Sequence, residues 1–264
     1  ESNLGFKLFQ RAARQMALTE EGQRLFQVVS TSLSMINTEV QAIHRQCLQG
    51  VVTLRTLPSL GLKWLVGRLS DFQQRYPDIE LRVEAEDSSV ALTDGQYDIA
   101  IDLGHGVYED LQTTRLMPEK IFPVCSPKLL AQEATISTPA DLKHFTLLHD
   151  VTAWRDADDY SEWEYWGKTI GQDDLDFSKG PTFNRAFLTL HAAINGQGIA
   201  MGREALINDE ISTGQLVDLF PDLHVKTRNH YHLVYARGAL DNPRIKALHD
   251  WLVEQSSVDA QDTG

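Results

Sequence analysis

The chain is poor in cysteine and has no long apolar run. Its two cysteines, Cys47 and Cys125, fall in different predicted elements and match no metal-ligand or redox spacing. We therefore expect reduced thiols, no disulfide framework and no metal site. No apolar segment approaches the roughly 20 residues that cross a bilayer, and the N-terminus lacks the basic start, apolar stretch and cleavage site of a signal peptide. The sequence thus predicts a cytoplasmic protein without a membrane partner.

Sequence fingerprints of catalysis are also missing. The chain contains no GxSxG, HExxH, P-loop or dinucleotide-binding pattern, and no acid/base group emerges from the spacing of its residues. We therefore expect that the protein is not an enzyme and needs no cofactor.

The acidic charge is unevenly distributed. The 264 residues carry a formal net charge of −13, which would argue against nucleic-acid binding if it were spread evenly. Residues 1–50 hold five bases against four acids, a balance of +1, so the later residues hold −14. The hydrophobic content of 42% suffices for the cores of one large or two medium domains. The acidity therefore belongs to the later domain.

The first residues predict a long amphipathic helix after an abrupt start. No cap or turn precedes Glu1, and we expect that an earlier part of a domain is absent. Between about residues 19 and 46, apolar side chains recur at steps of three and four, as on one face of a helix. They are Leu25, Val28, Val29, Leu33, Ile36, Val40 and Ile43. Such a helix either docks on its own core or pairs with a second copy as a coiled coil, and the spacing does not decide between these.

Residues after Gly50 predict α/β structure. A strand at 51–57, a helix opening at Pro58 and Ser59, and strands at 79–85 and 98–102 form a βαβ-type unit, which favours a largely parallel sheet. A comparable unit follows. We place its strands near 146–149 and 199–201, its helix at 185–195, and a last strand and helix at 231–236 and 244–253. The last two have no sheet neighbours nearby in sequence and could return to the first unit.

The opening stretch resembles the end of the DNA-binding domain of LysR-type transcriptional regulators. The pattern LG..LF.R..R...LT..G..L is carried by Leu4-Gly5, Leu8-Phe9, Arg11, Arg14, Leu18-Thr19, Gly22 and Leu25. The stretches 76–79, 98–101, 123–127, 192–198 and 214–217 are similar to recurrent segments of that family's effector domain. Residues 58–66, 146–150 and the pair Trp163 and Trp166 are most similar to the glycine-cleavage-activator subgroup, which includes the β-lactamase regulators.

The resemblance implies an α/β effector domain of two Rossmann-like lobes, like a type-2 periplasmic binding protein, behind the remnant of a winged helix-turn-helix. The expected divisions are the wing at 1–18, a dimerisation helix at 19–49, and the effector domain at 50–264. Within the last, lobe I spans 51–123 and 229–264, and lobe II spans 124–228. Nearly all of the base-reading helix would precede Glu1.

The same resemblance implies partners. Lys7, Arg11 and Arg14 would contact the phosphates of promoter DNA in the full-length protein, although an ordinary solvated basic turn explains them as well. The protein would form a homodimer or homotetramer and bind a small-molecule effector. A periplasmic-type solute-binding protein without DNA binding is the alternative, but it would need neither a wing nor a long helix with an apolar stripe.

The implied effector site lies in the cleft between the lobes. In the resemblance it includes Ser59, Leu60, Asp102, Gly104, Phe183, Asn184, Gln197 and Gly198. Ser59 and the backbone N–H groups around it would receive a carboxylate, and Asp102 would receive an ammonium, which suits an amino-acid-like effector. The plainer alternatives are that Ser59 only caps its helix and that Asp102 lies in a surface turn.

Three further features favour ordinary structural roles. Trp163 and Trp166 are expected to pack inward, with the neighbouring acids outside, rather than to form a carbohydrate platform. His230 and His232 share a strand face, but no third metal ligand stands at a suitable spacing. Cys125 has no basic neighbour to stabilise a thiolate, so we expect it to be a packing residue.

Overall fold

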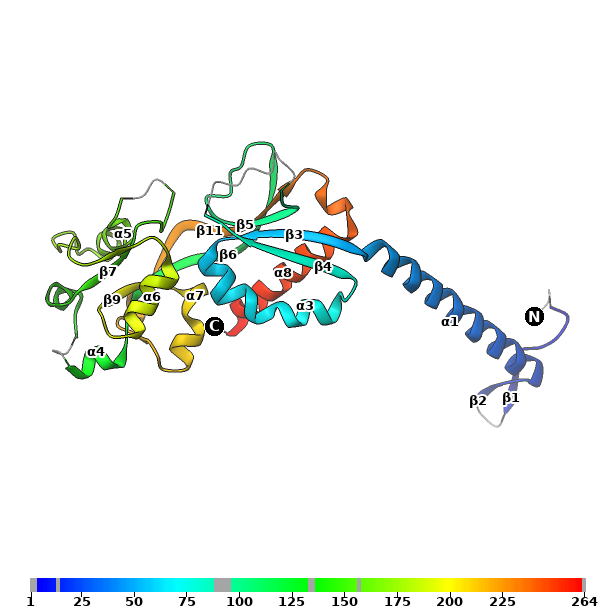
Figure 1. Ribbon diagram of the computed structural model, residues 1–264. Coiled ribbons are helices and arrows are strands. Elements are labelled where there is room, and N and C mark those ends of the chain that lie inside the picture. The colour runs from blue at the N-terminus through cyan, green and yellow to red at the C-terminus, as the bar shows by residue number, and fades with distance from the viewer. Residues whose placement is uncertain (1–3, 13–14, 88–95, 133–135, 156–157, 263–264) are drawn as a thin grey trace. The chain divides into compact units, whose positions relative to one another are not determined.

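The computed structural model describes residues 4–12, 15–87, 96–132, 136–155 and 158–262. Residues 11, 12, 15, 38, 40–47, 132 and 258–262 are described by their backbone only. The chain forms two compact units, residues 1–49 and 50–264 (Figure 1). In the described part of the chain, no helix is long and apolar enough to cross a membrane.

The first unit is a β-hairpin fixed to the start of a helix. Strands β1 (Phe9–Ala12) and β2 (Gln15–Leu18) pair antiparallel, and α1 (Glu20–Leu48) follows. Thr19 is the N-cap of α1: its Oγ1 accepts from Gly22 N at 2.9 Å and donates to Lys7 O at 2.6 Å. A Cβ on Gly22 would lie 2.1 Å from the backbone oxygen of Leu8, so only glycine allows this close approach.

Helix α1 carries exposed apolar side chains along its described length. Large exposed fractions belong to Phe26, Val29, Leu33 and Ile36, at 60%, 45%, 61% and 60%. Glu20 and Glu21 lie in the first turn, where acidic side chains interact favourably with the helix dipole. A stripe of this kind is stable in water when another apolar surface covers it.

The second unit is built on one mixed sheet of nine strands. Its strands are β3 (Gly50–Thr56), β4 (Ile79–Ala85), β5 (Ile99–Gly104), β6 (Leu111–Cys125), β7 (Leu147–Asp150), β8 (Thr182–Phe183), β9 (Ile199–Arg203), β10 (Val217–Asp218) and β11 (Val225–Ala236). The order is β4-β3-β5-β11-β6-β9-β7-β8, with β10 paired to β6. Two parallel sets, β4-β3-β5 and β9-β7-β8, are joined through the antiparallel strands β11 and β6.

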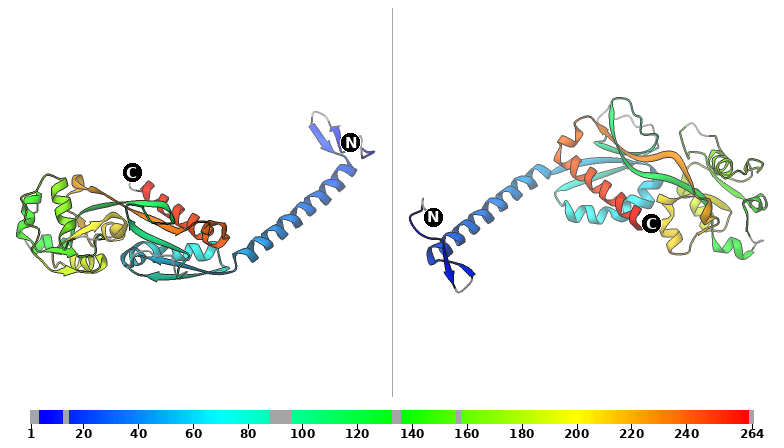
Figure 2. Two further views of the ribbon diagram at one scale, coloured as in Figure 1. Left: turned by 90° about the horizontal axis from the view of Figure 1, so that it is seen from above. Right: turned by 180° about the vertical axis from the view of Figure 1, so that it is seen from behind.

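Helices cover both parallel sets (Figure 2). We call β4-β3-β5 with its helices the first half, and β9-β7-β8 with its helices the second half. The first half contains α2 (Pro58–Leu60), continued by helical turns into α3 (Leu69–Arg75), and α8 (Pro243–Asp262). The second contains α4 (Pro127–Gln132), α5 (Ser161–Thr169), α6 (Ala186–Ile194) and α7 (Glu204–Ser212). The ring of Trp251 on α8 lies 5.1 Å from that of Phe72 on α3, and its Nε1 donates to Asp71 at 2.7 Å. The last strand and helix of the chain therefore return to the first half.

The parallel arrangement predicted for the unit at 51–104 is confirmed, since β3 pairs parallel with both β4 and β5. The whole sheet is mixed, because β6 and β11 run antiparallel to each other and to both neighbouring strands. One expectation about α5 needs correction. Trp163 and Trp166 do pack inward with no exposed surface, but Glu162 lies inside with them at 3% exposure. Its carboxylate is turned inward because it forms an ion pair with a buried arginine of β9.

Candidate functional site

A cavity of about 300 Å³ opens where the strand ends of the two parallel sets meet. Leu57 and Ser59 follow β3, Asp102 lies in β5, Asp150 ends β7 and Arg203 ends β9, and all five border the cavity. The carboxyl ends of parallel strands in open α/β sheets are where such folds bind ligands, because connecting loops and helix starts leave polar groups there. The cavity is therefore placed by the topology of the sheet.

Ser59 connects the first half to helix α6 of the second. Its Oγ accepts a hydrogen bond from Phe187 N at 3.2 Å. The N-cap of its own helix is Leu57, followed by Pro58 at the first position, and no side chain caps that end. Ser59 thus makes a contact across the cavity rather than a cap. Leu60 beside it is buried and also borders the cavity.

Asp102 is a buried carboxylate at the cavity wall, not a residue of a surface turn. It is 5% exposed. Its Oδ2 accepts from the hydroxyl of Tyr108 at 2.8 Å and lies 3.6 Å from the guanidinium of Arg155. Burial, followed by the charge of Asp102, raises the pKa of Tyr108, so its hydroxyl stays protonated and donates.

A buried charge network forms the floor of the cavity. The guanidinium of Arg203 lies 2.8 Å from Glu119, 2.7 Å from Glu162 and 3.5 Å from Asp150. Glu119 also accepts from Trp154 Nε1 at 2.8 Å and from Thr227 Oγ1 at 2.6 Å. One cation thus faces three buried carboxylates.

Protonation of Glu162 removes one of the three negative charges around Arg203. Burial, with repulsion from Asp150 and Glu119 and against the attraction of Arg203, raises the pKa of Glu162 to about 8. Burial lowers the pKa of Arg203, but the charges of Glu162, Glu119 and Asp150 outweigh that effect and raise it, so Arg203 stays charged. Asp150, which borders the cavity, is held by the backbone N–H and hydroxyl of Thr152 at 3.0 and 2.9 Å.

Ion pairs also connect the two halves beside the cavity. Arg185, at the start of α6, lies 2.7 Å from Asp87. Burial raises the pKa of Asp87, and the charge of Arg185 opposes that effect. Lys63 in the first half pairs with Glu210 on α7. Together with the Ser59 contact, these interactions hold the halves against each other.

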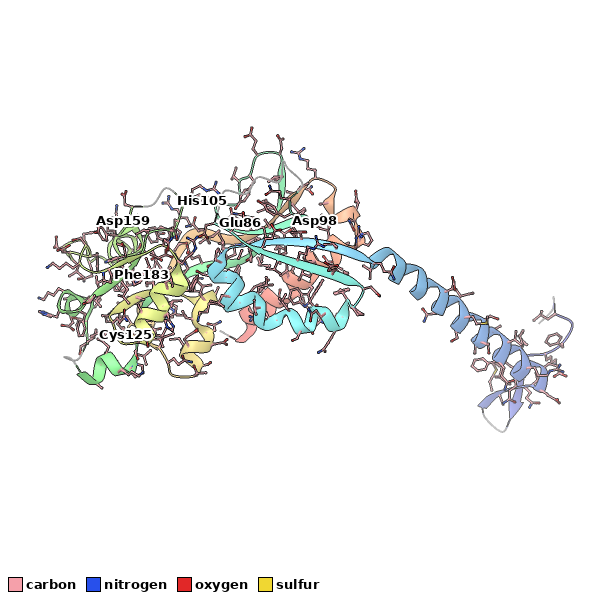
Figure 3. The ribbon with its side chains drawn as sticks, in the orientation of Figure 1. Glu86, Asp98, His105, Cys125, Asp159 and Phe183 are labelled. Carbon is pink, nitrogen blue, oxygen red and sulfur yellow. The ribbon has the colours of Figure 1, made fainter. Side chains whose placement is uncertain are left out.

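The remaining predicted site residues fall into three groups. Gly104 borders an adjoining pocket rather than the cavity itself. Phe183, labelled in Figure 3, ends β8, and Asn184 follows it. Neither is among the described residues that line the cavity, but Asn184 O accepts from the hydroxyl of Thr152, a cavity residue, at 2.9 Å. Gln197 and Gly198 are not among the described residues that line either pocket. A Cβ on Gly198 would lie 2.4 Å from Thr146 O, so this glycine serves the packing of β9.

Sequence reasoning missed most of the charged lining. Asp87, Asp150, Arg155, Arg185 and Arg203 all border the cavity. Asp150 and Arg203 each end a strand at the same sheet edge as Asp102, so strand-end position was a usable signal. For Arg155 and Asp87, which lie in loops, the sequence offered no local signal.

Residues singled out elsewhere are placed as follows. Lys7 is exposed. Arg11 lies in β1, but its side chain is outside the described residues, as is the whole of Arg14. The rings of His230 and His232 are 6.0 Å apart, and the described residues contain no cluster of three or more His, Cys, Asp or Glu suited to a metal. Cys125 is fully buried, which raises the pKa of its thiol to about 11.

Comparison with known proteins agrees with this architecture. Residues 45–257 match the family model described as LysR substrate binding domain. The HTH-type transcriptional regulator DsdC of Escherichia coli (strain K12) is 38% identical over 255 residues, which cover 97% of this chain and 81% of that protein. The glycine cleavage system transcriptional activator of the same strain is 33% identical over 261 residues, covering 99% and 83%.

A solved structure shows the same fold. The effector domain of the transcriptional regulator AmpR of Pseudomonas aeruginosa matches with a TM-score of 0.68 and 28% identity, covering 81% of this chain and 99% of that one. The chain therefore belongs to the LysR family of transcriptional regulators, and residues 45–257 form its periplasmic-binding-protein-like effector-binding domain.

Proposed function

We propose that the effector of this regulator is an amino-acid-like molecule held in the cavity between the two halves. The observation that carries the proposal is that charged groups of both signs, Asp102, Asp150 and Arg185, border one cavity of about 300 Å³. A ligand with an ammonium and a carboxylate would complement both. One relative is named an activator of the glycine cleavage system, and glycine is such a molecule.

Each charge of the effector has a matching group. The ammonium would lie against the carboxylates of Asp102 and Asp150, and the carboxylate would lie against Arg185 and the hydroxyl of Ser59. Charge-assisted hydrogen bonds of this kind are among the stronger polar contacts in proteins, and burial strengthens them. Arg185 would exchange part of its interaction with Asp87 for the ligand, which links binding to a contact between the halves.

Calorimetric titration of the purified chain with glycine, alanine, serine and their N-acetyl derivatives tests this proposal. The free amino acids should bind, and loss of the positive charge on acetylation should abolish binding. Asp102→Asn keeps the shape and should weaken binding by about 10-fold or more, since a hydrogen bond to a charged group contributes about 1.5–3 kcal/mol. Asp173→Asn, an exposed residue outside the cavity lining, is the control. Equal affinity for acetylated and free amino acids would refute the ammonium site.

We also propose that the first unit carries DNA contact and self-pairing. Lys7 precedes β1 and Arg11 lies in it, and together with Arg14 they would contact phosphates. The side chains of Phe26, Leu33 and Ile36 are exposed on α1, which supports pairing with a second copy as a coiled coil. Light scattering of the chain and of Leu33→Glu should give a dimer or larger assembly for the first and a smaller species for the second.

DNA contact has its own measurement. Binding of the full-length regulator to its promoter should weaken steeply as the salt concentration rises. Replacing Lys7 by Gln should reduce the slope of the logarithm of the binding constant against the logarithm of the salt concentration by about one. Effector binding would control promoter binding only if it favours one arrangement of the oligomer over another. The contacts between the halves, Ser59–Phe187 and Asp87–Arg185, are the groups whose arrangement the effector would change.

A further inference from the structure

A second pocket, of about 810 Å³, adjoins the effector cavity. The two share the lining residues Asp102, Leu103, Trp154 and Arg155. The loop after β5, helix α5 and the stretch Thr227–Asn229 of β11 form the remaining walls. His105, labelled in Figure 3, lies in that loop. A ligand in the first cavity would thus lie directly beside a larger pocket.

Arg155 lies at the boundary between the two pockets. The side chain of Arg155 is 59% exposed, and its contact with Asp102 is a long one of 3.6 Å. Trp154, by contrast, is fixed through Nε1 to the buried Glu119. A long arginine side chain with one weak contact can change rotamer at little cost. A ligand group could therefore pass Arg155 without disturbing the rest of the wall.

The second pocket is suited to an anion. Lys168 and Arg228 border it, and neither forms an ion pair with any described carboxylate. Arg155 adds a third cation at the boundary. Of the acids in the lining, Asp102 already accepts from Tyr108, which leaves Glu164 as the one described carboxylate without a partner. Aromatic walls are provided by Tyr165 and Trp154, whose rings meet edge to face at 5.4 Å.

We propose that the second pocket is a distal subsite for an anionic group at the end of the effector's side chain. The proposal rests on the proposed function, since the first cavity must hold the ammonium and carboxylate of the same molecule. The chemical class is then an amino acid whose side chain ends in a carboxylate or a phosphate. The apolar part of that side chain would lie along Trp154, and its anionic end would lie near Lys168 and Arg228.

Titration of the whole chain with a matched ligand series tests the subsite. The probes are alanine, aspartate, glutamate and 2-aminoadipate for length, glutamine as the neutral match of glutamate, and O-phosphoserine for the phosphate, each as both enantiomers. At least one anionic member should bind 10-fold or more tightly than alanine, and glutamate should exceed glutamine. Relative affinities of the carboxylates and O-phosphoserine distinguish the two sources of negative charge.

Substitutions that remove a positive or a negative charge from the second pocket should change the affinity for anionic ligands in opposite directions. Lys168→Gln and Arg228→Gln should each weaken the best anionic ligand by about 5-fold or more and leave alanine within 2-fold. Glu164→Gln, which removes a negative charge from the same pocket, should strengthen it. If alanine binds, but anionic ligands bind no more tightly than alanine and none of these variants changes their affinity, the subsite is refuted and the proposed function stands. If no amino acid binds at all, the proposed function itself fails.

Discussion

Glu162 should make the protein less stable as the pH rises. Its folded-state pKa of about 8 exceeds the ordinary value of 4.5, because the charged form is buried beside two other acids. Between these values the folded protein binds more protons than the unfolded chain, so the free energy of unfolding falls with increasing pH. At about 1.36 kcal/mol per pKa unit, this loss of stability grows by about 3 kcal/mol between pH 5.5 and pH 8.5.

Glu162→Gln removes this loss while keeping the shape of the side chain and an acceptor for Arg203. The variant should resemble the wild type near pH 5, and its stability advantage should widen by about 3 kcal/mol between pH 5.5 and 8.5. Urea unfolding monitored by tryptophan fluorescence measures the difference, since Trp163 and Trp166 share helix α5 with the mutated residue. Glu164→Gln, exposed on the same helix, should follow the wild type at every pH. An advantage that is constant or shrinks with pH would contradict the assignment of a strained, buried carboxylate.

Two other outcomes follow from packing. Gly22→Ala would place a Cβ 2.1 Å from Leu8 O and should destabilise the junction between the hairpin and α1 by about 1–3 kcal/mol, seen as faster hydrogen exchange of the β1 and β2 amides. Gly67→Ala, whose Cβ would meet nothing within 4 Å, should be neutral, and equal exchange in both variants would remove the close-packing explanation. In a Cys47→Ser background, Cys125 should resist thiol reagents at pH 8 in the folded protein, since burial raises its pKa to about 11, and should react on unfolding; rapid labelling of this native variant would show that the Cys125 thiol is accessible.

Local patterns predicted most elements of the fold. The strands at 51–57 and 79–85 appear as β3 and β4, and the long amphipathic helix appears as α1, because the spacing of apolar residues differs between strands and helices. Strand β6 was not predicted. Pro118 and Pro123 interrupt its sequence, and proline cannot donate to a ladder. The structure accommodates Pro118 beside a register shift of β11 between Lys226 and His230, which no single-strand pattern reveals.

The site was less accessible to sequence reasoning. Ser59 and Asp102 could be placed because each follows or lies within a predicted strand at the expected sheet edge. Glu162 was expected outside, since it alternates with tryptophans among other acids. Its burial depends on Arg203, which comes from a distant part of the chain. Contacts that join separate elements leave no periodicity in either one, so the charge network could be found only in three dimensions.

The paired strands β6 and β11 have a consequence for how this fold can be dissected. Ile121 and Val225 are direct partners in the ladder, so the polypeptide enters the second half and leaves it at neighbouring positions. The second half is thus an insertion into the first, with its two connections side by side. A foreign domain whose own ends are close together could therefore replace the second half. The first half is assembled from the segments before and after the insertion, so a single cut cannot isolate it.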